Sequence, residues 1–119
     1  MPSKIIAVAL DCVDTDELSR FWSAVFGTGE VSRWADADGT EYVEIGTGLG
    51  ATLLLQPVPE AKRGKNRLHL DLAPATGDQD DEVRRLVALG ATVVSDEERH
   101  RWVVMADPEG NEFCVLPPR

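Results

Sequence analysis

Cysteine, positive charge and long apolar runs are all scarce in this 119-residue sequence. Its two cysteines, Cys12 and Cys114, lie far apart and lack the close spacing of a redox or zinc motif. The first residues turn acidic too soon for a secretory leader, so we expect a cytoplasmic protein with reduced thiols. No apolar run approaches the roughly 20 residues that cross a bilayer, which excludes a transmembrane protein.

The charge balance narrows the classes of partner. There are 21 acidic residues against 12 basic ones, which gives a formal net charge of -9. Such a field repels phosphate backbones and anionic lipid headgroups, so we expect neither nucleic acid nor a membrane surface as a partner. Length and composition are those of one globular domain, with 43% hydrophobic and 28% charged residues.

The first half of the chain has the pattern of a β-α-β-β-β unit. Residues 4–12 alternate in polarity, which predicts a strand with Ile6, Val8, Leu10 and Cys12 on its core face. An amphipathic helix follows, which Asp14 or Thr15 can cap and which ends before Gly27. Three short strands are then expected, separated by glycine-containing turns, at residues 30–34, 41–45 and 52–56.

The second half repeats this order. The predicted elements are a strand, a helix and three strands, at residues 67–72, 80–89, 91–94, 101–105 and 112–116. A shift of 60 residues places Leu55 on Val115, and a shift of 62 places Leu10 on Leu72. We interpret this as a duplication within one domain, residues 1–119, with modules at 4–57 and 66–117 joined by a linker at 58–65. The predicted fold class is α+β, in which the two modules form a curved, half-open barrel with a central cleft.

Three stretches carry a resemblance to a known family. They are Asp11-Cys12-Val13-Asp14 leading to Leu18-x-x-Phe21-Trp22, then Asn66 to Leu72 with His69 at its centre, and Trp102 leading to Asp107-Pro108-Glu109-Gly110-Asn111. Together they cover nearly the whole chain. The sequence resembles the vicinal oxygen chelate superfamily, which includes glyoxalase I, bleomycin-resistance proteins and extradiol dioxygenases. It is most similar to the small glyoxalase-like domain proteins of bacteria.

The resemblance implies four positions for metal ligands, two from each module. Carried over by motif, they are Ala7, Leu54, His69 and Cys114. Ala7 and Leu54 have no donor atom, so only two of the three protein ligands of a catalytic zinc site remain. A register shifted by two residues reaches Asp71 but offers only a weak set of hard ligands. We therefore expect no cofactor, no stoichiometric divalent metal and no glyoxalase I activity.

The predicted cleft would hold a small organic molecule. Seven residues are expected to line it: Ala7, Asp11, Leu54, His69, Asp71, Trp102 and Cys114. His69 is the candidate general acid or base, aided by Asp71, although a nearby carboxylate can equally satisfy a histidine that has no catalytic role. Trp22 is expected in the core. Trp34 and Trp102 suit either the cleft or the core, and the core is favoured for each taken singly.

Three functions stay open at this point. The first is a small-molecule-binding protein that holds an organic, aromatic ligand without changing it. The second is a lyase, isomerase or dioxygenase-type enzyme that uses His69 as acid/base or as part of an altered metal site. The third is an accessory module that acts through dimerisation, which would need an exposed apolar face. A homodimer is expected in any case, because modules of the superfamily often pair between chains.

Overall fold

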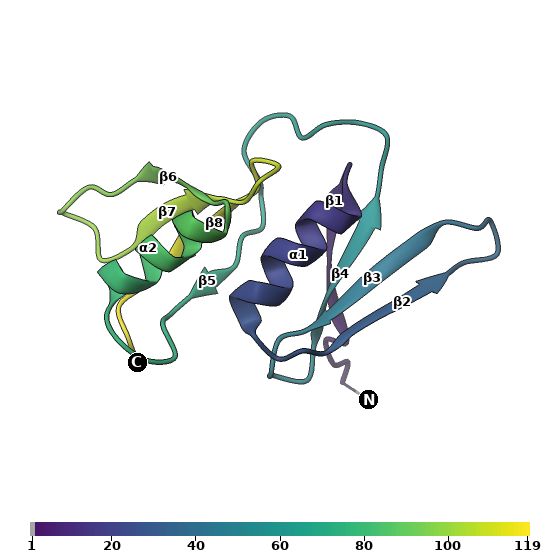
Figure 1. Ribbon diagram of the computed structural model, residues 1–119, viewed down its shortest axis with the longest axis horizontal. Helices are drawn as coiled ribbons and strands as arrows, with labels where there is room; N and C mark the ends of the chain where they lie inside the picture. The colour runs from purple at the N-terminus through teal and green to yellow at the C-terminus, as the bar shows by residue number, and fades with distance from the viewer. Residues whose placement is uncertain (1) are drawn as a thin grey trace. The chain divides into compact units, whose positions relative to one another are not determined.

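The computed structural model describes residues 2–119 and divides into two compact units, Met1–Ala61 and Lys62–Arg119 (Figure 1). The boundary between the units falls inside the predicted linker at 58–65. Each unit has the element order β-α-β-β-β. No helix in this described part of the chain is long and apolar enough to span a membrane.

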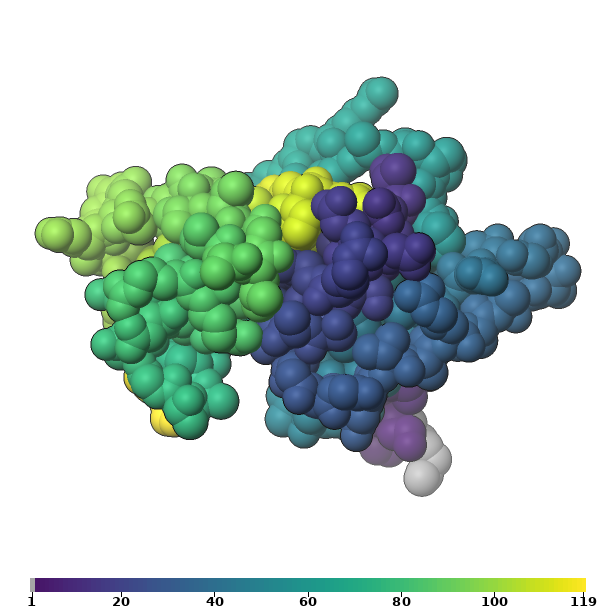
Figure 2. Space-filling view, in the orientation of Figure 1, coloured from purple at the N-terminus to yellow at the C-terminus, as the bar shows by residue number. Residues whose placement is uncertain are grey.

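Unit 1 is a four-stranded sheet with one helix. Its elements are β1 (Ala7–Cys12), α1 (Thr15–Phe26), β2 (Val31–Ala35), β3 (Glu41–Gly46) and β4 (Thr52–Pro57). The strand order is β1-β4-β3-β2, in which β1 and β4 are parallel and the other pairs antiparallel. All residues of β2 are exposed, and the β2–β3 hairpin projects from the rest of unit 1 (Figure 2).

The helix α1 begins and ends where the sequence predicts. The side chain of Asp14 accepts a hydrogen bond from the Glu17 N–H at 3.0 Å, and Gly27 ends the helix with a φ of 64°, a conformation that glycine adopts without strain. Its apolar stripe includes Trp22, which is only 2% exposed, so the core position predicted for this tryptophan is confirmed. The sheet residues that complete this core are fully buried: Val43, Ile45, Leu53 and Leu55.

Unit 2 repeats the plan with a shorter first strand. Its elements are β5 (Asp71–Leu72), α2 (Gln79–Leu89), β6 (Thr92–Ser95), β7 (Val103–Ala106) and β8 (Glu112–Val115), with strand order β5-β8-β7-β6. The strand predicted at 67–72 forms only at its end. Residues 67 and 68 form a bend, and the Asn66 N–H donates to the Glu112 side chain at 2.9 Å rather than to a neighbouring strand.

The two sheets match position by position, which confirms the α+β fold class with two β-α-β-β-β modules. In unit 1, Leu54 of β4 lies opposite Ala9 of β1 and Glu44 of β3. In unit 2, Cys114 of β8 lies opposite Asp71 of β5 and Val104 of β7. Each row therefore crosses three strands at equivalent places. Both sheets are open, with β1 and β2 at the edges of one and β5 and β6 at the edges of the other.

Candidate metal centre

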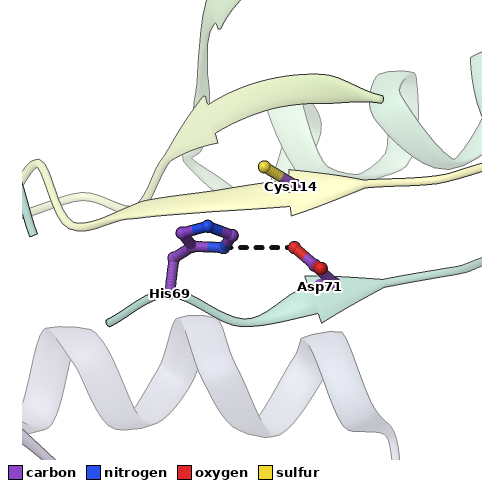
Figure 3. Close-up of side chains that lie close together, drawn as sticks. All are labelled: His69, Asp71 and Cys114. Atoms are coloured by element: carbon purple, nitrogen blue, oxygen red, sulfur yellow. Dashed lines mark ion pairs between the residues drawn. The ribbon is translucent and has the colours of Figure 1, made fainter. Parts of the chain in front are cut away.

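Three side chains of unit 2 bring together the donor atoms that a metal ion needs. They are His69, just before β5, Asp71 in β5 and Cys114 in β8 (Figure 3). One nitrogen, one carboxylate oxygen and one sulfur from these residues all lie within 4.8 Å of one another. The sequence analysis singled out each of these residues, but it did not place them in one ligand set.

The parallel pairing of β5 and β8 sets Asp71 beside Cys114. The two residues are opposite each other in the ladder. The Cys114 N–H donates to the Leu70 carbonyl at 2.9 Å, and the Leu116 N–H donates to the Leu72 carbonyl at 2.7 Å. Phe113 and Val115, which flank Cys114, are buried in the core. Because successive residues of a strand point to opposite faces, Cys114 points away from those two side chains.

His69 lies between the bend at residues 67 and 68 and the start of β5, and its side chain contacts that of Asp71. Residues two apart on a regular strand lie about 6.6 Å apart along it. Here the imidazole Nδ1 lies 3.1 Å from Asp71 Oδ1, and the two side chains are 39% and 57% exposed. The interaction was anticipated from the sequence, as Asp71 helping His69, whereas the inclusion of Asp71 in a three-residue group with Cys114 was not.

The Cys114 thiol lies in an environment that keeps its proton. Burial raises the pKa of Cys114, and the negative charge and hydrogen bonding of Asp71 raise it further, while the positive charge of Lys65 acts in the opposite direction. A thiol coordinates a metal only after it has lost its proton. Coordination by Cys114 therefore has to release that proton, which a divalent cation beside Asp71 favours.

The chemistry of the three donors fits a borderline-soft divalent ion. Imidazole nitrogen, carboxylate oxygen and thiolate sulfur are all established zinc ligands, whereas Mn²⁺ and Mg²⁺ prefer oxygen-rich sites. Three protein ligands are the number found in catalytic zinc sites, where the fourth position is left to water or substrate. The group thus has three protein donors, whereas the sequence analysis counted two.

The other predicted cleft residues are not members of this group. By strand alternation, Ala7, Asp11 and Leu54 share the face of the unit 1 sheet that points away from α1. Trp102 precedes β7 in unit 2 and stacks on His100, with ring centroids 4.7 Å apart. Trp34 and Trp102 are 43% and 42% exposed, so the core position favoured for them is wrong. A single cleft lined by all seven residues stays a prediction.

One arrangement of polar side chains escaped the sequence analysis. Glu44 in β3 accepts hydrogen bonds from Trp34 Nε1 at 2.7 Å and from Thr52 Oγ1 at 3.0 Å. Each partner lies on a neighbouring strand, so the contacts depend on pairing that the sequence does not reveal. The available signal was the alternation of β3, which puts Tyr42 and Glu44 on the face opposite the buried Val43 and Ile45.

Comparison with known proteins agrees with the fold. A family model described as a glyoxalase-like domain matches residues 7–116. No curated protein matches the chain significantly. Among solved structures, a mutant of the fosfomycin resistance protein FosX from Listeria monocytogenes, complexed with Mn(II) and 1S,2S-dihydroxypropylphosphonic acid, is 16% identical, with a TM-score of 0.76 over 98% of this chain and 93% of that chain.

Two further structures show the same likeness. Glyoxalase I of Leishmania major is 15% identical, with a TM-score of 0.72 over 97% of this chain and 86% of that one. A glyoxalase/bleomycin resistance/dioxygenase family enzyme from Burkholderia phytofirmans is 20% identical, with a TM-score of 0.68 over 95% and 97%. At this identity the likeness establishes the fold, and a site has to be argued from its own residues.

The expectation of no cofactor is wrong. It rested on counting His69 and Cys114 as the donors of the inherited register, whereas in the structure one ligand atom each of His69, Asp71 and Cys114 lie within 4.8 Å of one another. A protein of the same fold, FosX, has been solved with Mn(II). The error arose because the two registers were counted separately, His69 and Cys114 in one and Asp71 in the other, whereas the structure brings residues of both registers together.

Proposed function

Because the chain belongs to the glyoxalase-like domain family, we propose that it holds a divalent metal ion at His69, Asp71 and Cys114 and presents it to a small organic molecule with adjacent oxygen atoms. The observation that carries the proposal is the convergence of three different donor types in unit 2. Zinc is the ion that this mixed donor set suits best.

The three residues have distinct tasks. Asp71 brings the negative charge that attracts a cation, and its Oδ1 lies 3.1 Å from Nδ1 of His69. Cys114 supplies the soft donor from a strand whose flanking residues are fixed in the core. A divalent ion bound here acts as a Lewis acid that polarises an oxygen of the bound molecule.

We assign His69 to the metal rather than to acid/base chemistry. A neutral imidazole has one lone pair in the ring plane, and a lone pair that coordinates a cation cannot also accept a proton. The donor count also favours an ion with room for substrate over a closed structural site, because the group formed by the described residues has three protein ligands.

Calorimetric titration of the dialysed protein with Zn²⁺ and Mn²⁺ tests the metal. We expect one equivalent of zinc, bound more tightly than manganese, and a loss of affinity of more than about a hundredfold in Cys114→Ser, because outer-shell changes alone cost about 10- to 100-fold. Cys12→Ser is the matched control, since Cys12 is the other cysteine and lies buried in unit 1. Equal binding by wild type and Cys114→Ser would refute the assignment.

A separate titration tests the organic ligand. Acetohydroxamate carries two adjacent oxygen donors and should bind zinc-loaded protein in a saturable manner. The affinity should be lost in His69→Ala protein under the same zinc concentration. Zinc binding without acetohydroxamate binding would leave a structural metal site and would contradict the proposed presentation of the ion to a small molecule.

The homodimer is a further proposal, independent of the metal. Sedimentation velocity of the full chain at micromolar concentration should show the mass of two chains. A single species of 13.0 kDa would refute it.

A further inference from the structure

Of the three proposed metal donors, His69 alone lies outside a strand. Asp71 begins β5 and Cys114 lies within β8, whereas residues 58–70 form neither helix nor strand (Figure 3). The carbonyl of Leu70, one residue after His69, accepts a hydrogen bond from the Cys114 N–H at 2.9 Å. On its other side His69 needs a second point of attachment, because backbone outside regular structure keeps its freedom unless other groups fix it.

The Glu112 side chain supplies that attachment. Glu112 begins β8, and its Oε2 accepts a hydrogen bond from the Asn66 N–H at 2.9 Å. Its Oε1 lies 2.5 Å from Nζ of Lys62. One carboxylate therefore holds two points of the segment that leads to His69. We call the group formed by Lys62, Asn66 and Glu112 the β8 clasp.

The ion pair of the β8 clasp is shielded from solvent. The Lys62 and Glu112 side chains are 18% and 17% exposed, whereas those of the surface pair Arg84 and Asp81 are 71% and 60% exposed. Exposed pairs contribute little to stability, but a shielded pair is costly to break because one charge is then left without its partner. The Lys62 ammonium also donates to the Gly64 carbonyl. The β8 clasp is therefore expected to stay closed in solution.

The backbone that carries Glu112 is fixed by the turn between β7 and β8. Asp107 accepts hydrogen bonds from the Asn111 N–H at 3.0 Å and from the Asn111 side-chain amide at 2.9 Å. Both residues are buried. The Asn66 side-chain amide adds a long contact, at 3.5 Å, to the Asn111 side-chain oxygen. Glu112 follows Asn111 directly, so the carboxylate of the β8 clasp extends from a rigid backbone.

We propose that the β8 clasp is a positioning device, which fixes the backbone before His69 so that the imidazole is in place beside Asp71 before a metal binds. This inference rests on the proposed metal function and names residues that act on the site without touching the ion. Glu112 is outside the donor group of the described residues, and each of its oxygens already has a partner. A donor held in advance loses less freedom on coordination, and groups outside the ligand sphere change metal affinity by about 10- to 100-fold.

Lys62 allows positioning to be separated from charge. Removal of a positive charge close to a cation site tightens cation binding by electrostatics alone. Loss of the β8 clasp should instead weaken it, so the two effects give opposite predictions for Lys62→Met. Arg63→Met is the matched control, because Arg63 is an exposed basic residue of the same segment and the variant removes the same charge.

The zinc affinity of the full chain, measured by competition with a chromophoric chelator, gives the first readout. We expect Lys62→Met to bind zinc about tenfold more weakly than Arg63→Met, at the lower end of the range for groups outside the ligand sphere. Lys62→Arg, which restores the positive charge, should bind zinc as the wild type does. Zinc binding by Lys62→Met as tight as by Arg63→Met would overturn the proposal.

A second readout needs no metal and separates this proposal from the metal function. The chain has two histidines, so isotope labelling of histidine nitrogen gives ring signals from His69 and His100 alone in nuclear magnetic resonance spectra. In dialysed Glu112→Ala and Lys62→Met proteins, the ring signals of His69 should shift toward those of free imidazole, while those of His100 stay unchanged.

The possible outcomes of this spectrum are distinct. Unchanged His69 signals in both variants would refute the β8 clasp even where zinc binds. Signals of His69 and His100 that move together would show a general loss of structure in unit 2 and would also refute a positioning role. A shift confined to His69 in a chain that binds no zinc would support the β8 clasp and refute the proposed metal function.

Discussion

The two units have equivalent backbone positions on three adjacent strands, but the side chains at these positions differ. In unit 1 the row reads Ala9, Leu54 and Glu44, and in unit 2 it reads Asp71, Cys114 and Val104. The polar groups lie on the parallel pair β5 and β8 in unit 2, but on β3 in unit 1. In a repeated sheet the buried face can thus stay the same while the side chains of the opposite face change. On that face, unit 2 has three possible metal donors, and unit 1 has a carboxylate beside aromatic rings.

The cores of the two units should respond alike to truncation, and this is the largest effect expected. Leu55 in unit 1 and Val115 in unit 2 occupy equivalent ladder positions, and both are fully buried. Leu55→Ala should lower the free energy of unfolding by about 2–5 kcal/mol, and Val115→Ala by somewhat less, because each leaves a cavity. Urea unfolding followed by circular dichroism measures both.

The neighbour Leu54 provides the contrast within unit 1. It is only half-buried and lies on the face opposite α1. Leu54→Ala should therefore cost clearly less than Leu55→Ala. A cost for Leu54→Ala that equals that of Leu55→Ala would show that the two faces have been assigned wrongly.

Introducing the three donor residues at the equivalent positions of unit 1 tests whether these sheet positions are sufficient to form a metal site. The triple variant Ala7→His, Ala9→Asp, Leu54→Cys should bind a second zinc ion, but at least about tenfold more weakly, because β1 is regular from Ala7 onward and spaces residues two apart by about 6.6 Å. Residues 2–6, which precede β1, contain no equivalent of the bend just before His69, to which we attribute the tighter site. A second ion bound as tightly as the first would contradict the role given to that bend.

The smallest expected effect is on the pH dependence of stability, through an aspartate in a turn. In unit 1 the hydrogen bond from Tyr42, together with backbone N–H donors, lowers the pKa of Asp36 below its usual value of 3.8, against the opposing effect of burial. Its contribution to stability is present above pH 3.8 and is lost as the pH falls through the lowered folded-state pKa. In unit 2 an aspartate also holds a turn, but a different one, between β7 and β8, where Asp107 accepts a hydrogen bond from the Asn111 amide at 2.9 Å.

Asp36→Asn should therefore be less stable than wild type at neutral pH, and the difference should shrink as the pH falls below 3.8. Urea titrations at a series of pH values measure it. Tyr42→Phe removes the main cause of the lowered pKa and should flatten the acid dependence in the same way. A difference between wild type and Asp36→Asn that stays constant down to low pH would contradict the pairing of Asp36 with Tyr42.

Much of the fold could be predicted from local signals. Asp14 and Gly27 at the ends of α1, and Gly90 at the end of α2, act through their own backbone and side chains, so the sequence shows them directly. The alternation that buries Val43 and Leu55 is equally local. The strand predicted at 67–72 was overextended, because the Glu112 side chain, 46 positions further along the chain, binds the Asn66 N–H.

The site was predicted less well, since it depends on distant pairing. His69 and Cys114 were found through the family's motif, but their union with Asp71 requires the β5–β8 register and the bend before β5. Trp34 was expected inside because large aromatic residues are mostly buried. It stays exposed because β2 is an edge strand whose partner on that face is a single ring, Tyr42.

The central claim is that unit 2 binds a divalent metal through Cys114, together with His69 and Asp71. Titration of the dialysed full chain with Co²⁺, followed by absorption spectroscopy, tests it most directly, because thiolate coordination adds a charge-transfer band that no nitrogen or oxygen ligand produces. The account predicts that this band saturates at one equivalent, is absent in Cys114→Ser and is unchanged in Cys12→Ser. Absence of the band from the wild-type protein, or its persistence in Cys114→Ser, would contradict the account.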